Sequence, residues 1–108
     1  MKTELTVEES ARLIELGVDP KMASRETFIF DKIFTLDDIL SILPKEIEQE
    51  DRHPMTVVYY WNSTKKEWIA YYDYVEKTIM ASAPELIDSL YQLLIWGFKN
   101  GHLKTDKL

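Results

Sequence analysis

The side chains best suited to acid–base or metal chemistry are two histidines and a run of carboxylates. His53 follows Glu48, Glu50 and Asp51 in a charged segment, and His102 lies near the end of the chain. Carboxylates and an imidazole can gather a hard cation, but this spacing matches no calcium-binding loop, and a solvated charge run is the simpler interpretation. The chain has no cysteine, which excludes thiol nucleophiles, zinc–thiolate sites and disulfides and fits a reducing compartment.

No catalytic motif surrounds these groups. The sequence contains no G-x-S-x-G elbow, no glycine-rich phosphate loop and no H-E-x-x-H pair, and it has only three glycines. We therefore predict a protein that is not an enzyme and that has no catalytic residue, no cofactor and no metal site. A hydrolase or metalloenzyme built on the acidic loop and His53 is the less favoured alternative.

Aromatic side chains are concentrated in one short region instead. The segments MTVVYYWN and EWIAYYDYV flank the turn 63–66, and the simplest hairpin register places Trp61 opposite Trp68. Both faces of this hairpin are then substantially apolar, although a hairpin with one solvated face needs only one apolar side. One face is expected to pack on the core and the other to bind a partner. The candidate interaction surface consists of Tyr60, Trp61, Trp68, Tyr71 and Tyr72.

Charge and ring chemistry narrow the kind of partner. The net charge of −6 disfavours direct binding of DNA or RNA, whose phosphates require cationic surfaces. Tyrosine and tryptophan are enriched at protein interfaces, so we predict a non-enzymatic interaction protein that binds a protein partner or a second copy of itself. The alternative is a small-ligand or glycan-binding module that stacks on these rings. A helix-turn-helix in segment 5–24 is less favoured, because its second helix is short and its first helix is acidic.

The pattern of elements predicts one α+β domain over residues 1–108. Thr6 with Glu9 caps a first helix that ends at Gly17, and Asp19 caps a short second helix. Segment 26–34 is rich in aromatic and β-branched residues and is interpreted as a strand, with an aromatic-packed loop as the alternative. A third helix follows Thr35, and segment 45–54 is interpreted as a charged loop. Because two strands are marginal alone, a short third strand is expected over 78–81, giving a small antiparallel sheet of the hairpin plus one or two short strands.

The segment 82–101 organises the fold. It predicts a long C-terminal helix that is apolar around most of its circumference, so other parts of the chain or a partner must cover it. Ser82 with Glu85 is interpreted as a capping box at its start, and Gly101 as its end. We expect the sheet to pack on one side of this helix and the N-terminal helices on another.

Three stretches resemble small uncharacterised proteins of anaerobic gut bacteria and of their prophages and conjugative elements. They are LTVEESARLIELGVDP, FTLDDILSILPKEI and ELIDSLYQLLIWGFKNGHL, and the resemblance covers about two-thirds of the chain. It implies an accessory role in a mobile element and carries over no catalytic residue. The polar start of the sequence and the absence of a long apolar run lead us to expect a cytoplasmic protein without a membrane span.

Overall fold

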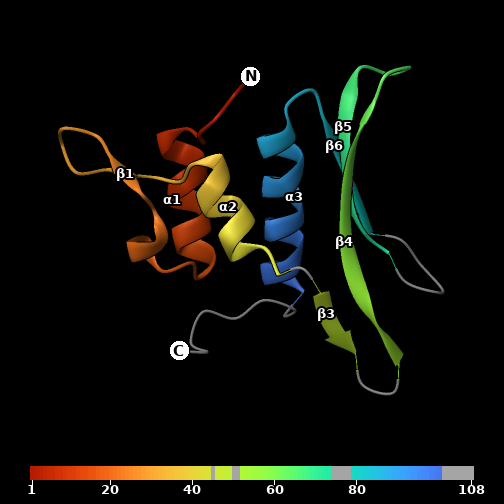
Figure 1. The fold of residues 1–108 in the computed structure, drawn as a ribbon. Coiled ribbons are helices and arrows are strands. Elements are labelled where there is room, and N and C mark those ends of the chain that lie inside the picture. The colour runs from red at the N-terminus through yellow and green to blue at the C-terminus, as the bar shows by residue number, and fades with distance from the viewer. Residues whose placement is uncertain (45, 50–51, 74–78, 101–108) are drawn as a thin grey trace.

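Helix α3, Leu86–Lys99, forms the middle layer of the structure, a computed structural model that describes residues 1–44, 46–49, 52–73 and 79–100. A four-stranded antiparallel sheet lies on one side of α3, and helices α1 and α2 lie on the other (Figure 1). The helix packs against the sheet through strands β5 and β6 and against both N-terminal helices. The predicted α+β class, with the sheet packed on a C-terminal helix, is therefore confirmed.

The N-terminal layer follows its capping signals. Helix α1, Val7–Leu16, begins with the reciprocal capping box of Thr6 and Glu9, and it ends at Gly17, whose φ of 121° favours a residue without a Cβ atom. A single 3₁₀ turn follows at Pro20–Met22, where the Asp19 carboxylate accepts a hydrogen bond from the N–H of Lys21. Helix α2, Leu36–Ile42, repeats the capping box with Thr35 and Asp38.

Segment 26–34 is not the continuous strand that its composition predicts. Strands β1, Arg25–Glu26, and β2, Lys32–Ile33, form a two-residue antiparallel ladder, and the chain between them turns back on itself. The Thr27 N–H donates to the Asp31 carbonyl oxygen at 2.9 Å, and the Thr27 hydroxyl oxygen accepts from the N–H of Asp31 at 3.1 Å. These local hydrogen bonds compete with an extended strand and close a tight loop instead.

The main sheet has the strand order β3-β4-β5-β6. Strand β4, Arg52–Asn62, pairs with β5, Glu67–Asp73, in the predicted register, with Trp61 opposite Trp68. The turn between them is closed by the Asn62 side-chain oxygen, which accepts hydrogen bonds from the N–H groups of Thr64 and Lys65. The expected third strand is β6, Ile79–Ala83.

The prediction that segment 45–54 is only a charged loop is wrong for its described backbone. Strand β3, Glu46–Gln49, pairs with the first part of β4, where Ile47 lies opposite Met55 and Glu46 opposite Thr56. A short, charged strand at the edge of a sheet is a common arrangement, since charge discourages further pairing there. The loop was predicted from the charged side chains of this segment, whereas strand pairing is made by backbone groups that composition does not reveal.

The predicted capping box of α3 is also wrong. Ser82 and Ala83 belong to β6, where they pair with Ile69 and Trp68, and the helix begins three residues later. Glu85 is the N-cap residue and makes no side-chain capping bond. Its carboxylate instead accepts a hydrogen bond from the backbone N–H of Lys2 at 3.0 Å, which ties the N-terminal segment to the start of α3. The predicted end at Gly101 lies outside the described residues.

One contiguous cluster of buried side chains joins both halves of the chain. From the N-terminal layer it takes Leu13, Phe34 and Ile39, and from α3 it takes residues such as Leu90 and Leu94. The sheet contributes through its inner face, the face toward α3, with Ala70, Tyr72, Ala81, Val57 and Trp68. The small residues Ala81 and Ala83 on β6 allow the helix to approach the sheet closely.

This packing predicts a sharp contrast between neighbouring positions of β6. Ala81 is 8% exposed on the inner face, whereas Ser82 is exposed on the opposite face. We expect Ala81→Leu to lower the free energy of unfolding by about 1–3 kcal/mol, because the added volume must fit between β6 and α3. Ser82→Leu should change it by less than about 0.5 kcal/mol. Urea unfolding of the two variants measures both values, and equal effects would contradict the assignment of the faces.

Candidate interaction surface

The five predicted surface residues lie in three different environments. Tyr60 and Tyr71 point away from α3, on the outer face of the sheet, with ring centroids 6.3 Å apart in an edge-to-face arrangement. Trp61 and Trp68 lie on the inner face near the 63–66 turn, with centroids 5.7 Å apart. Edge-to-face contacts between aromatic rings contribute about 0.5–1.5 kcal/mol beyond simple burial. Each pair therefore supports the hairpin as well as providing apolar surface.

Tyr72 is a correction to the predicted surface, because it is fully buried. Its hydroxyl donates a hydrogen bond to the Pro44 carbonyl oxygen at 2.6 Å, and its ring lies 6.2 Å from that of Trp96 on α3. Burial raises the pKa of the Tyr72 hydroxyl well above its usual value. Tyr72 therefore belongs to the core, and its hydrogen bond to Pro44 connects the sheet to the residues that follow α2.

The outer face of the sheet is a continuous apolar surface. Alternation along the strands places Val58 and Tyr60 of β4, Ile69 and Tyr71 of β5, and Met80 of β6 on this face. Met80 is 59% exposed and Tyr60 is 45% exposed, while Ile69 is only 7% exposed because it lies at the centre of the group. Within the described chain, every helix lies on the other side of the sheet (Figure 1).

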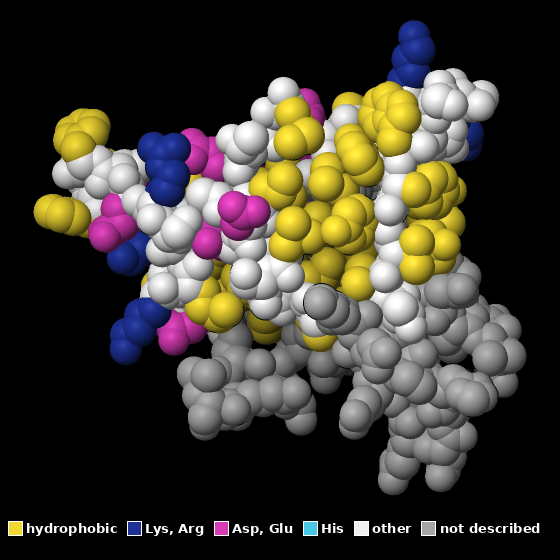
Figure 2. Space-filling view, viewed as in Figure 1, with side chains coloured by type: hydrophobic (Ala, Val, Ile, Leu, Met, Phe, Trp, Pro, Cys, Tyr) yellow, Lys and Arg dark blue, Asp and Glu magenta, His cyan; other side chains and the backbone are white. Residues whose placement is uncertain are grey.

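The exposed apolar surface continues around strand β4 to the inner face. Tyr59 and Trp61 point to the same side as α3, yet they are 42% and 45% exposed, because α3 packs over β5 and β6. Figure 2 shows hydrophobic side chains on both sides of the pale backbone of β4. The structure thus adds Tyr59, Val58 and Met80 to the surface that the sequence pattern predicted.

A second apolar feature, absent from the predicted surface, is the tip of the β1–β2 hairpin. Phe28, Ile29 and Phe30 are 93%, 63% and 79% exposed, at the end of the molecule opposite the sheet (Figures 1 and 2). Phe30 adopts a φ of 70°, and its N–H donates to the Thr27 carbonyl oxygen at 2.9 Å. The sequence signal was the threonine and aspartate at positions 27 and 31, whose local hydrogen bonds favour a turn.

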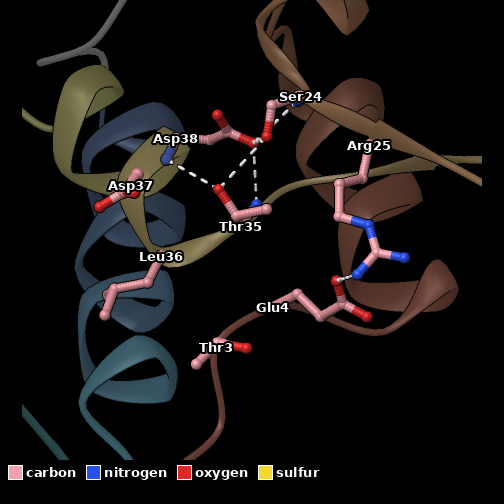
Figure 3. A pocket seen from close by; sticks show the side chains of 8 residues that line it. All are labelled: Thr3, Glu4, Ser24, Arg25, Thr35, Leu36, Asp37 and Asp38. Atoms are coloured by element: carbon pink, nitrogen blue, oxygen red, sulfur yellow. Dashed lines mark hydrogen bonds and ion pairs between the residues drawn. The ribbon is translucent and has the colours of Figure 1, made fainter.

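A polar hollow of about 520 Å³ separates the hairpin from the N-terminal segment (Figure 3). An ion pair between Arg25 and Glu4, 2.7 Å long, lies on one side of it. On the other side one oxygen of Asp38 accepts hydrogen bonds from the N–H of Thr35 and from the N–H and hydroxyl of Ser24, each at 2.9 Å. No aromatic ring lines the hollow, so ring stacking on a sugar would take place elsewhere.

The carboxylate of Asp38 is tuned by these contacts. Burial would raise the pKa of Asp38, but the hydrogen bonds from Thr35 and Ser24 outweigh it and lower the pKa below the usual range. The same groups cap α2 and hold the segment before β1, which is sufficient reason for their arrangement. The polar groups around the hollow are therefore accounted for by their role in stabilising the fold.

The side chains considered for metal or acid–base chemistry lie outside what the structure describes. The side chains of Glu48, Glu50, Asp51 and His53 are not among the described ones, and the same holds for His102. Elsewhere in the described chain, no group of three or more potential metal ligands lies close together.

The helix-turn-helix interpretation meets a geometric difficulty. The second element of the motif is a single 3₁₀ turn of three residues, Pro20–Met22, whereas a recognition helix must extend along a DNA groove. The preceding helix α1 carries Glu8 and Glu9 in its first turn. This segment therefore lacks both the length and the charge for base recognition.

Comparison with known proteins adds no relative. No protein-family model matches the chain, and neither a curated protein nor a solved structure matches it. In the part of the chain that the structure describes, no helix is long and apolar enough to cross a lipid bilayer.

The Asp38 contacts predict a pH-dependent loss of stability. Because the pKa of Asp38 is lower in the folded chain than in the unfolded chain, its carboxylate stabilises the fold above the unfolded pKa, and this contribution is lost as the pH falls through the folded pKa. We expect Asp38→Asn to lower the free energy of unfolding by about 1 kcal/mol near neutral pH, because hydrogen bonds to a charged acceptor become hydrogen bonds to a neutral one.

The difference between Asp38→Asn and the natural chain should shrink as the pH drops below about 3.9, the ordinary aspartate pKa. Chemical denaturation followed by tryptophan fluorescence at several pH values measures this difference. A difference of the same size at both ends of the pH range would show that the charge of Asp38 does not stabilise the fold.

Proposed function

We propose that this chain is a non-enzymatic interaction protein that binds another protein, or a second copy of itself, through the aromatic part of its sheet. The observation that carries the proposal is the exposed apolar surface around β4 and the outer face, with Tyr59, Tyr60, Trp61 and Met80 each between 42% and 59% exposed. Several large exposed apolar side chains that adjoin one another on a small protein are characteristic of interaction sites.

The chemistry of the rings favours a protein as the partner. Tyrosine and tryptophan combine large apolar area with a polar group and little rotamer entropy, and they recur at the centres of protein interfaces. The net charge of −6 disfavours nucleic acid. The acidic surface and the resemblance to small proteins of prophages and conjugative elements lead us to propose a cytoplasmic accessory role in a mobile element.

The glycan-binding alternative has less support. Sugar stacking needs an accessible ring face with hydrogen-bonding groups beside it, usually in a hollow. Here Tyr60 meets Tyr71 and Trp61 meets Trp68 edge to face, and no residue of the four-stranded sheet lines the polar hollow. The aromatic surface therefore fits a broad apolar partner better than a small polar one.

Two matched variants test the proposed surface. Trp61→Ser and Phe28→Ser each remove an exposed aromatic ring, the first from the sheet and the second from the remote hairpin tip. We expect the natural chain and Phe28→Ser to retain the same partner at comparable affinity, and we expect Trp61→Ser to lose about 10-fold or more, as for an aromatic hot spot.

The measurement is quantitative affinity capture with each immobilised variant, followed by titration of the captured protein, together with light scattering to detect self-association. Circular dichroism of each variant verifies that the fold is retained. Identical binding by the Trp61 and Phe28 variants, or a chain that neither captures a protein nor self-associates, would contradict the proposed function.

A further inference from the structure

Part of strand β4 has a backbone edge that no described strand pairs with. Strand β3 pairs with β4 only as far as Thr56, whereas β5 continues along it from Thr56 to Asn62. Residues 57–62 therefore have a strand on one side, and no described strand lies on the other. Half of their backbone N–H and C=O groups point away from the sheet and can pair with another strand.

The side chains of this edge are exposed on both faces of the sheet. Tyr59 and Trp61 project on the inner face beyond the cover of α3, and Tyr60 projects on the outer face; the three are 42–45% exposed. A partner that contacts one face alone would leave the opposite rings in water. An added strand pairs with the backbone and shelters the flanks of both faces together.

Features that normally prevent edge pairing are missing from residues 57–62. The sequence VVYYWN has no charged residue, no proline and no glycine, and the irregularity in the ladder lies between Ile47 and Gln49, outside this stretch. Natural edge strands are usually blocked by such devices. An uncharged stretch of high β-propensity with an open edge is instead typical of a strand that pairs.

We propose that a second copy of this chain pairs with this edge, β4 against β4 in antiparallel orientation, so that two sheets join into one. This inference rests on the proposed function and names its partner. A two-fold axis perpendicular to the sheet and passing by Tyr59 brings like faces together. It places Tyr59 opposite Tyr59 of the second copy, Val57 opposite Trp61, and Val58 opposite Tyr60. The pairing ends there, and Asn62 of each copy must bend away from the ladder, because Glu46 already occupies the position opposite Thr56.

Charge and side-chain pairing favour a second copy as the occupant. Every facing pair in this register is aromatic or β-branched, which is the type of cross-strand pair that stabilises a sheet. No charged group lies within residues 57–62, so two acidic chains can meet here without placing like charges opposite each other. The joined strands would also cover residues 57–61 of the β4 edge in both copies.

The interface is small, which sets the concentration at which it forms. The exposed parts of Tyr59, Tyr60 and Trp61 amount to roughly 250–300 Å² per copy if each ring offers about 200 Å². With the backbone edge added, the buried area stays below the ~800 Å² per partner of a standard interface. We therefore expect a reversible dimer with a dissociation constant of micromolar order or weaker.

Disulfide cross-linking tests the register directly. The chain has no cysteine, so single cysteines report without background. Directly opposed residues of an antiparallel pair have Cα atoms about 4.5–5.5 Å apart, within the ~4.4–6.8 Å range of disulfides. The two cysteines of a Tyr59→Cys dimer would therefore be close enough to form a disulfide. We expect Tyr59→Cys to form a disulfide dimer at least ~10-fold faster than Phe28→Cys, whose thiols meet only by collision. Equal rates would overturn the register.

A charge at the same position tests the dimer without a covalent bond. Light scattering across a concentration series should show the mass of the natural chain rising from one copy toward two. Tyr59→Lys places two ammonium groups opposite each other and should raise the dissociation constant at least ~10-fold, whereas Phe28→Lys should not change it. Unchanged circular dichroism separates this result from misfolding.

The outcomes distinguish this inference from the proposed function. A natural chain that stays monomeric at millimolar concentration, or a dimer that Tyr59→Lys leaves intact, overturns β4 pairing between copies. If such a monomer still binds another protein in a way that depends on Trp61, the proposed function stands and only the identity of the partner is wrong. If it binds nothing, both fail.

Discussion

The rest of the structure depends on the burial of helix α3. Seven of its residues are buried, and they face two different directions, toward the sheet and toward α1 and α2. A helix with so wide an apolar circumference cannot rest on a single layer, because one layer would leave a stripe of leucine and isoleucine in water. The three-layer arrangement follows from this requirement, and the N-terminal segment secures it through Lys2, whose ammonium group lies 3.0 Å from Glu9 and 2.7 Å from Asp88.

The same requirement explains why the sheet is unevenly covered. Helix α3 approaches most closely over β6, where Ala81 and Ala83 leave room, and over β5, where Ala70 is fully buried. One helix is too narrow to cover a third strand as well. Strand β4 consequently keeps exposed rings on the inner face, and the described chain contains no second helical layer for the outer face. The interaction surface is thus the part of the sheet that α3 cannot reach.

Local signals in the sequence predicted the elements that local chemistry stabilises. The capping boxes of α1 and α2, the stop at Gly17 and the register of Trp61 with Trp68 are set by residues close in sequence, and each prediction is confirmed. The prediction that Ser82 caps α3 failed because Ser82 instead pairs with Ile69 in the sheet, and a local capping sequence does not reveal this pairing. Strand β3 was missed for the same reason, since it is defined by backbone pairing with a segment that follows it in the chain, Ile47 opposite Met55.

The candidate surface was predicted only in part. Composition identified the aromatic hairpin, but alternation alone does not show which face meets the helix or how far the helix extends across it. Tyr72 was therefore assigned to the surface although it is buried against Trp96, and Tyr59 was left out although it is 42% exposed. The exposure of the hairpin tip at Phe28 was not predicted, because three large apolar residues in a row are normally buried.

The central claim is that the described part of the chain covers only one face of the sheet. Paramagnetic relaxation from a small soluble gadolinium chelate, measured by NMR on a dilute sample, tests this claim most directly because it reports the distance of each proton from solvent. Signals of Met80, Tyr60 and Tyr71 should broaden strongly, and those of Ala70, Ala81 and Leu90 should not. Protection of Met80 and Tyr60 equal to that of Ala81 in the dilute monomer would contradict the account.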